Sequence, residues 1–341
     1  MEKRAKLAIV GAGQIADSHA KAALAIPEFE LAFVVDPALE RARAFAERWR
    51  PEARAVAKLG DALGEIDAAV IATPNDSHAP LALECLRAGV AVLVEKPMAT
   101  NVRGGEEIVA AAEAANVLLA VGYSTRFFWN VQFMKELLQR GELGRPRRFA
   151  YQYGFKGGWS SYSGYHLDRQ AVGGGVLVTT GTHFLDRVLD WFGYPDRLEY
   201  EDDADGGPEA NARAGFGWSA GDGLEGSARF SRTVTLSNGI CVETDRGVAI
   251  LREDPSAPVH FRPHGSSYVA DLRPTVNPQA AIAKGIFQLQ LEEFAEALRE
   301  QRAPLVDGRI GLASLRLVEN LYACRRPLVS DPYYGATESH S

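Results

Sequence analysis

The glycine-rich segment between residues 6 and 16 constrains this chain more than any other stretch. Its sequence, Lys6-Leu-Ala-Ile-Val-Gly-Ala-Gly-Gln-Ile-Ala16, passes from an apolar run through two glycines into helix-forming residues. Residues 7–10 are typical of a parallel strand that is buried on both faces, and residues 14–25 are typical of a helix. Gly11 allows the tight turn that ends the strand, while Gly13 would let a pyrophosphate approach the first N–H groups of the helix.

An acidic residue after the second expected strand adds to this pattern. Residues 31–35 form that strand, and Asp36 follows it directly. A carboxylate at this place can accept hydrogen bonds from the ribose hydroxyls of NAD and would repel the 2′-phosphate of NADP. We therefore expect NAD, with NADP less favoured, and a first set of cofactor-binding residues: Gly11, Gly13, Gln14, Ile15 and Asp36. Alternatively, Asp36 only caps a helix that begins at Pro37.

The next buried strand, residues 67–72, ends in the polar sequence Thr73-Pro-Asn-Asp-Ser-His78. Ligands of doubly wound sheets bind beyond the carboxyl ends of the parallel strands. Thr73, Asn75 and His78 are therefore predicted cofactor contacts. As an alternative, Asp76 or Ser77 simply caps the helix that follows.

A lysine follows the strand at residues 90–94, in the sequence Glu95-Lys96-Pro97. The proline disfavours helical backbone at Lys96, so the lysine is presented at the edge of the sheet. A partly desolvated lysine beside a nicotinamide can have its pKa lowered enough to exchange a proton with a substrate hydroxyl. We predict Glu95 and Lys96 as cofactor contacts and Lys96 as catalytic. The alternative is that Lys96 is an ordinary solvated surface charge.

Bulk properties limit the class of protein. A chain of 341 residues exceeds one ordinary core, and we expect two domains, a Rossmann domain over residues 1–124 and a second domain over residues 125–341. The net charge of −7 gives no basic surface for nucleic acid. No apolar stretch is long enough to span a membrane. Cys85, Cys241 and Cys324 are too few and too scattered to predict disulfides or a metal site, so a cytoplasmic location is expected.

The sequence pattern changes beyond Arg145. Alternating residues indicate an antiparallel sheet, with candidate hairpin turns at Asp222-Gly223 and Asn238-Gly239. The acidic residues 202–207 are expected to form an exposed loop, and the C-terminal helices 287–301 and 310–326 are expected to pack in a core. The expected strands are residues 147–155, 213–218, 227–236 and 240–244.

Candidate substrate residues lie on either side of the first of these strands. Arg126 and Trp129 could line a pocket for a polyol or could merely pack at a domain junction. The loop 159–190 holds polar and aromatic residues, among them Tyr162 and His166, and the glycines 173–175 join it to a helix that begins near Thr179 or Thr180. Thr179 and His183 lie four residues apart and so share a face of that helix. His183 could accept a hydroxyl proton, or it could simply be a packing residue.

These motifs together resemble the Gfo/Idh/MocA family of glucose–fructose oxidoreductase and inositol dehydrogenase relatives. The resemblance covers nearly the whole chain, in motif order and spacing. It implies a Rossmann domain followed by an α+β domain with a large, mainly antiparallel open sheet, through which a homodimer or homotetramer forms. It also implies an NAD(P)-dependent oxidoreductase that acts on a sugar, a sugar derivative or a cyclitol. The motifs are Gly11-Ala-Gly-Gln-Ile-Ala16, Ala72-Thr-Pro-Asn-Asp-Ser-His78, Glu95-Lys96-Pro97, Gly122-Tyr-Ser-Thr-Arg-Phe127 and Gly173-Gly-Gly-Val-Leu-Val-Thr-Thr-Gly-Thr-His183.

One position departs from the family pattern. Thr179 stands where that pattern has the aspartate of a Lys/Asp/His set, and threonine cannot carry its negative charge. Asp168 is a candidate substitute. We predict Lys96, His183 and Thr179 as catalytic residues, and no metal site. The departure leaves two alternatives, an NAD-dependent glycosidase or lyase that works by transient oxidation, and an inactive sensor of nucleotide and sugar. The predicted substrate-binding residues are Lys96, Arg126, Trp129, Asp168, Thr179 and His183.

Overall fold

The computed structural model describes residues 4–157, 164–220, 223–276 and 278–329. The candidate loop residues Trp159 and Tyr162, the side chain of His166 and the turn residue Asp222 lie outside this description. The chain divides into two compact units. The first unit comprises the residues up to Phe127 together with Gln279–Arg316, and the second comprises Phe128–Pro278 together with the residues from Leu317 onward.

The first unit is built on a parallel sheet with the strand order β3-β2-β1-β4-β5-β6. The side chains of β1 alternate between two apolar clusters, because Leu7 and Ile9 join one cluster while Ala8 and Val10 join the other. Burial on both faces explains why these strands read as continuous apolar runs, and it confirms the predicted Rossmann class. The strands are β1 (Ala5–Val10), β2 (Phe29–Val35), β3 (Arg54–Val56), β4 (Ala68–Ile71), β5 (Ala91–Val94) and β6 (Leu119–Val121).

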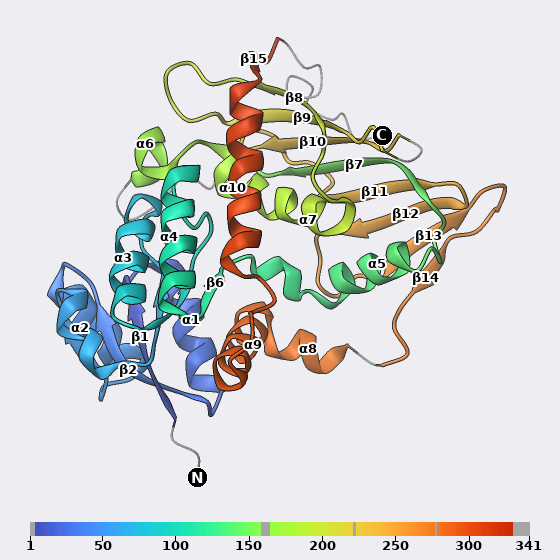
Figure 1. Cartoon of the computed structure of the whole chain (residues 1–341). Coiled ribbons are helices and arrows are strands. Elements are labelled where there is room, and N and C mark those ends of the chain that lie inside the picture. The colour runs from blue at the N-terminus through green and yellow to red at the C-terminus, as the bar shows by residue number, and fades with distance from the viewer. Residues whose placement is uncertain (1–3, 158–163, 221–222, 277, 330–341) are drawn as a thin grey trace. The chain divides into compact units, whose positions relative to one another are not determined.

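Helices cover both faces of this sheet (Figure 1). One face holds α1 (Gln14–Ala25), α2 (Leu39–Trp49) and α9 (Ile286–Glu300). The other face holds α3 (Asn75–Arg87) and α4 (Val102–Ala115). Short 3₁₀ turns complete the unit, and α8 (Gln279–Lys284) precedes α9. The 3₁₀ turns are η1 (Leu59–Asp61), η2 (Leu63–Glu65) and η3 (Ser124–Phe127).

The segment Gln279–Arg316 belongs to the first unit, although chain order places it in the second predicted domain. Helix α9 packs against α1, and its Phe294 ring stacks on Phe29 with ring centroids 6.0 Å apart. A single boundary near residue 124 is therefore wrong for this segment. Local patterns identified the helix but could not show which sheet it covers.

The second unit is built on a mixed sheet with the strand order β14-β13-β12-β11-β7-β10-β9-β8-β15. Among the described strands, β10 pairs with β7 and β15 pairs with β8 in parallel, and the other pairs are antiparallel. This confirms the predicted sheet. The strands are β7 (Pro146–Gly154), β8 (Arg197–Asp202), β9 (Asn211–Gly217), β10 (Glu225–Ser231), β11 (Gly239–Thr244), β12 (Gly247–Arg252), β13 (Val259–Pro263), β14 (Ala270–Leu272) and β15 (Arg325–Pro327).

Two boundaries differ from the sequence expectation. Strand β10 ends at Ser231, five residues before the predicted end at Leu236. The acidic segment that we expected to be an exposed loop begins with Asp202, which is the last residue of β8 and is fully buried. Its carboxylate accepts a hydrogen bond from Arg325 Nε at 2.7 Å, and this ion pair compensates for the burial of the charge.

Helices α5 (Trp129–Gln139) and α7 (Thr182–Phe192) supply apolar side chains to the core of the second unit. Phe184 of α7 stacks on Tyr151 of β7 with ring centroids 3.9 Å apart. A Cβ at Gly226 would lie 2.0 Å from the Phe149 ring, so this aromatic core requires glycine on the neighbouring strand. The other helical elements of this unit are η4 (Tyr165–Leu167), α6 (Arg169–Val172) and the π-helical turn η5 (Leu177–Gly181). Helix α10 (Gly308–Ala323) begins in the first unit and ends in the second, with the division after Arg316.

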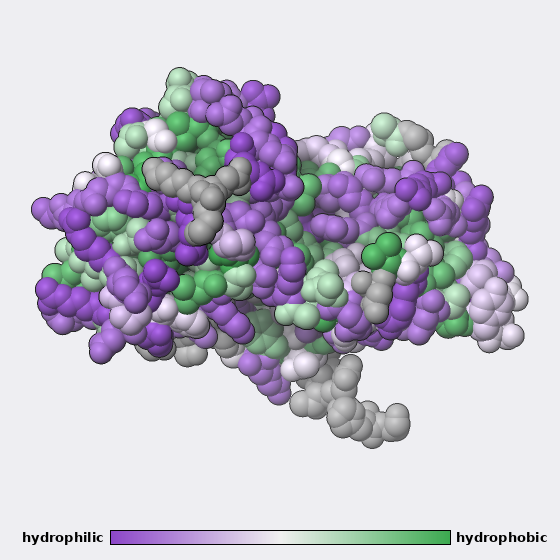
Figure 2. All heavy atoms as spheres, turned by 90° about the horizontal axis from the view of Figure 1, so that it is seen from below, coloured by the Kyte–Doolittle hydropathy of each residue, from purple (hydrophilic) through white to green (hydrophobic). Residues whose placement is uncertain are grey.

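One face of the molecule is largely polar. Figure 2 shows one face on which hydrophilic residues predominate and apolar residues form small, separate patches. Within the residues that the structure describes, no helix combines the length and the apolar character needed to cross a membrane.

Candidate functional site

The turn after β1 has the geometry of a phosphate-binding loop. Gly11 has a φ of +99°, and a Cβ there would lie 2.6 Å from the carbonyl oxygen of Ala72, so only glycine fits. A Cβ at Gly13 would meet nothing within 4 Å, which shows that the backbone at the start of α1 faces open space. Gln14 and Ile15 are exposed in the first turn of that helix. The residues predicted to hold a pyrophosphate therefore leave room for one.

Asp36 is buried at the end of β2 and bridges two loops. Its carboxylate accepts hydrogen bonds from the backbone N–H of Ala12 at 3.0 Å and from that of Ala38 at 2.9 Å. The Arg41 guanidinium lies 3.8 Å from the same carboxylate. Helix α2 begins at Leu39 with Ala38 as its N-cap, so Asp36 is not the cap of a helix beginning at Pro37. Instead, it ties the glycine turn to the loop after β2.

The loop after β4 is held by its own side chains. Helix α3 begins at Asn75, which is buried, and no side chain caps it, so the capping roles considered for Asp76 and Ser77 are wrong. The Ser77 hydroxyl instead donates to Thr73 Oγ1 at 2.7 Å. The buried His78 ring lies between two carbonyl oxygens, with Nε2 2.9 Å from that of Thr73 and Nδ1 2.8 Å from that of Pro97.

His78 therefore links the loop after β4 to the loop after β5. Burial lowers its pKa, and the two carbonyl contacts offset this only in part. These contacts give His78 a structural role, and its predicted contact with the cofactor stays a prediction. The ring thereby contacts the carbonyl group of Pro97, the residue that follows Lys96.

Glu95 and Lys96 follow β5 at the carboxyl edge of the sheet. Lys96 is half-buried, and its peptide bond to Pro97 is cis. The Glu95 carboxylate is buried and lies 2.7 Å from Nε2 of His19, a buried residue of α1. Burial by itself raises the pKa of Glu95, but the His19 hydrogen bond and the nearby Lys96 outweigh it and hold that pKa below its usual value. Glu95 is therefore an ionised residue beside the candidate catalytic lysine.

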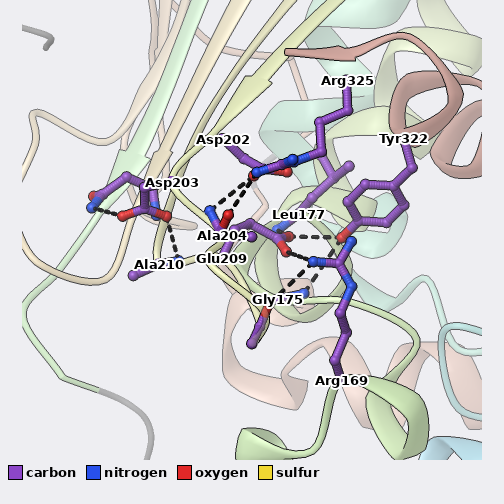
Figure 3. Close-up of polar contacts among 12 residues, drawn as sticks. Arg169, Gly175, Leu177, Asp202, Asp203, Ala204, Glu209, Ala210, Tyr322 and Arg325 are labelled. Atoms are coloured by element: carbon purple, nitrogen blue, oxygen red, sulfur yellow. Dashed lines mark hydrogen bonds and ion pairs between the residues drawn. The ribbon is translucent and has the colours of Figure 1, made fainter. Parts of the chain in front are cut away.

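In the second unit, the glycine segment, residues 173–175, packs against the buried Glu209, which Figure 3 shows with its partners. Glu209 is fully buried and accepts hydrogen bonds from the Tyr322 hydroxyl at 2.7 Å and from the Leu177 N–H at 3.1 Å. A Cβ at Gly175 would lie 2.2 Å from the carbonyl oxygen of Glu209, and one at Gly174 would lie 2.1 Å from the Tyr322 hydroxyl. The glycines are therefore needed for this close approach.

Thr179 and His183 follow this segment and are both half-buried. Thr179 lies on the π-helical turn η5, and π-helical turns are frequent at functional sites. Its hydroxyl donates to the carbonyl oxygen of Gly175 at 3.0 Å and accepts from Arg232 Nη2 at 2.9 Å. Arg232 also donates to the Thr180 hydroxyl at 3.1 Å, and it lies over the Phe155 ring. A guanidinium thus meets the hydroxyl at the position where the family pattern has an aspartate.

Three predicted substrate residues have structural contacts within their own units. Asp168 caps α6 and accepts hydrogen bonds from the N–H groups of Gln170 and Ala171. Trp129 is buried and donates its indole N–H to the carbonyl oxygen of Pro255. Arg126 is buried in the turn η3. Asp168 and Trp129 therefore have structural contacts, and their predicted contacts with a substrate stay predictions.

The predicted cofactor residues of the first unit share one edge of its sheet, because parallel strands end on the same side. Thr179 and His183 lie together in the second unit. Sequence reasoning missed His19, Arg232 and Glu209. The histidine on the glycine-turn helix was a usable signal, whereas Arg232 and Glu209 are remote in sequence from the residues they contact. In the described part of the chain, no cluster of three His, Cys, Asp or Glu side chains could hold a metal ion.

Comparison with known proteins supports this description. Residues 5–123 match the profile of the oxidoreductase family with an NAD-binding Rossmann fold, and residues 131–249 match the GFO/IDH/MocA C-terminal domain. The D-glucoside 3-dehydrogenase of Escherichia coli strain K12 is 30% identical over 202 residues, 56% of this chain and 54% of that protein. The scyllo-inositol 2-dehydrogenase (NADP(+)) of Bacillus subtilis strain 168 is 34% identical over 150 residues, 43% of this chain and 45% of that protein.

The matched segments span only about half the length of these two relatives. The fold similarity is more extensive. The crystal structure of the aldose-aldose oxidoreductase from Caulobacter crescentus, complexed with glycerol, superposes with a TM-score of 0.83, at 24% identity, over 94% of this chain and 97% of that chain. The two family profiles and this shared fold confirm the resemblance seen in the sequence motifs. This chain belongs to the Gfo/Idh/MocA oxidoreductase family.

Proposed function

We propose that this protein transfers a hydride between a nicotinamide cofactor and a secondary hydroxyl or keto group of a sugar, a sugar derivative or a cyclitol. The observation that carries the proposal is the half-buried Lys96 at the carboxyl edge of a dinucleotide-type sheet, directly after the ionised Glu95. The family profiles and the relatives named for a glycoside and an inositol support the substrate class.

The residues of the first unit fit a dinucleotide. Gly11 and Gly13 leave space at the start of α1, where N–H groups and the helix dipole favour a pyrophosphate. Asp36 has a carboxylate at the place where ribose hydroxyls would bind. When bound, the nicotinamide accepts or delivers the hydride. We propose NAD as the preferred cofactor, because Asp36 would repel a 2′-phosphate.

We assign proton transfer to Lys96 and His183. An ammonium at Lys96 polarises a substrate oxygen, and a neutral amine there accepts the hydroxyl proton. His183 is the second candidate, because an imidazole has its pKa near the working pH. Thr179 orients a substrate hydroxyl by hydrogen bonding. Its own hydroxyl is aligned by the contacts to Gly175 and Arg232.

The decisive experiment measures nicotinamide reduction by the purified protein across a panel of sugars, glycosides and inositols. We expect turnover with at least one member, and Lys96→Met should lower that turnover at least ~100-fold while NAD binding is retained. Lys21→Met, which removes an exposed lysine from α1, is the matched control. Turnover of a glycoside without net change in nicotinamide absorbance would favour the glycosidase or lyase alternative, and binding without any turnover would favour a sensor.

Two further proposals concern the assembly and the location of the protein. We propose a homodimer or homotetramer that forms through the open sheet of the second unit, as the family resemblance implies. We also propose a cytoplasmic location, which is supported by Cys85, Cys241 and Cys324 being unpaired thiols. Sedimentation analysis of the purified protein tests the first proposal, and cell fractionation tests the second.

A further inference from the structure

A buried imidazole–carboxylate pair lies directly beside Lys96. His19 of α1 is 1% exposed and Glu95 is 8% exposed, and their side chains meet at 2.7 Å. Since an ionised carboxylate only accepts hydrogen bonds, His19 Nε2 is the donor. No hydrogen-bond partner of His19 Nδ1 occurs among the described residues, so Glu95 is the polar group that orients this ring.

The pair is fixed by several elements of the first unit. A Cβ at Gly122, just after β6, would lie 2.9 Å from Glu95 Oε2 and 3.0 Å from Glu95 Cα, so the carboxylate fills the space that glycine leaves. The His19 and Phe287 rings pack edge to face, with centroids 5.1 Å apart. The backbone N–H of Lys96 donates to Glu95 Oε2 at 3.2 Å. The carboxylate is therefore held in one place, close to the start of the lysine.

Among the described residues, few titratable groups interact electrostatically with the Glu95 carboxylate. His19 faces it from α1, and Lys96 follows it in the chain. His78 of α3 interacts with it electrostatically, and Asp76 interacts with His78 in turn. Burial keeps the local dielectric low, so the negative charge of Glu95 acts strongly on a neighbouring cation.

We propose that His19 and Glu95 are positioning residues for Lys96: His19 holds the Glu95 carboxylate in place, and that charge keeps the Lys96 side chain protonated to a higher pH. Glu95 thereby sets the pH above which Lys96 can accept a proton from a substrate hydroxyl. This consequence rests on the proposed function, whereas the electrostatic coupling does not.

The coupling can be measured without any substrate. Reductive ¹³C-methylation labels the eight lysines of the chain and retains their charge, and Lys96→Arg identifies the Lys96 resonance. We expect Glu95→Gln to lower the NMR titration midpoint of Lys96 by at least about one pH unit, because a full charge within about 12 Å gives that much at an effective dielectric constant of ~20. Glu47→Gln removes a charge from the exposed surface of α2 and should leave the midpoint unchanged.

Substitutions of His19 provide a second test of the coupling between Glu95 and Lys96. His19→Leu removes the donor and should lower the Lys96 midpoint, whereas His19→Gln retains an N–H donor and should restore most of it. Circular dichroism and NAD binding show whether each variant is folded, and if Glu95→Gln does not fold, the two His19 variants decide. An unchanged Lys96 midpoint in folded Glu95→Gln, or equal midpoints in His19→Leu and the wild type, would overturn the proposal.

The pH profile of turnover connects the coupling to the reaction. If the proposed function holds, the pH at which turnover rises should move down in Glu95→Gln by the same amount as the NMR midpoint. If Lys96→Met leaves turnover unchanged, the proposed function fails, yet the NMR titration still tests the pair.

Discussion

Replacing the buried Glu209 by glutamine should change how the stability of the protein depends on pH. Burial raises the pKa of this carboxyl, and the hydrogen bonds from Tyr322 and Leu177 only partly offset the effect. An acid whose pKa is raised by folding stabilises the protein fully below its unfolded-state pKa. That contribution is lost as the pH rises from about 4.3, the usual value for glutamate, to the raised value in the folded state.

Glutamine keeps an acceptor for Tyr322 and Leu177 but cannot ionise, so Glu209→Gln should not suffer this loss. Its free energy of unfolding, relative to the wild type, should rise by up to about 1.4 kcal/mol per pH unit within that window and then level off. Glu209→Ala should behave differently. It leaves two buried donors, the Tyr322 hydroxyl and the Leu177 N–H, without their acceptor, at about 1–3 kcal/mol each.

Urea denaturation at a series of pH values between about 4 and 8 measures these differences. Glu225→Gln, at an exposed position of β10, controls for the loss of one negative charge. The reasoning is refuted if the difference between Glu209→Gln and the wild type is the same at every pH, or if it shrinks as the pH rises. It is also refuted if Glu209→Ala is as stable as the wild type.

Two further changes test the glycine turn and the glycine segment. Asp36→Ser should weaken the preference for NAD over NADP by about tenfold or more, equivalent to about 1.4 kcal/mol, and equal affinity of the wild type for both nucleotides would contradict this. Gly175→Ala should lower the free energy of unfolding by about 3 kcal/mol, because the new Cβ would lie 2.2 Å from a backbone oxygen that cannot move aside. Gly207→Ala, whose Cβ would meet nothing within 4 Å, should have little effect in the same denaturation experiment.

The sequence predicted the parts of the fold that depend on neighbouring residues. Helix α1 spans residues 14–25 as expected, because the glycine turn marks its start and apolar periodicity marks its length. The strand β8 was missed, although Leu198 and Tyr200 alternate with charged residues along it. The placement of Gln279–Arg316 in the first unit was also missed, since it depends on packing between residues far apart in the chain.

The same distinction holds for the candidate site. Lys96, Thr179 and His183 stand in recognisable local patterns, and the structure shows each at the end of a strand or along a helical segment, as expected. Arg232 could not be found this way, because it contacts Thr179 across 53 positions of sequence. It follows a strand that was predicted to continue, and the end of β10 at Ser231 places Arg232 outside that strand.

The contact between Gly175 and Tyr322 joins residues 147 positions apart, and it bears on how the protein is made. During translation, glycines 173–175 leave the ribosome well before Tyr322, whose hydroxyl contacts Gly175. The glycines that precede the helix carrying His183 therefore cannot make this contact until Tyr322 has been synthesised. The first unit is likewise incomplete until α9, which packs against α1, has been synthesised. Each unit therefore needs residues beyond 278 before its core is complete, and the apolar surfaces that those residues cover stay exposed until then.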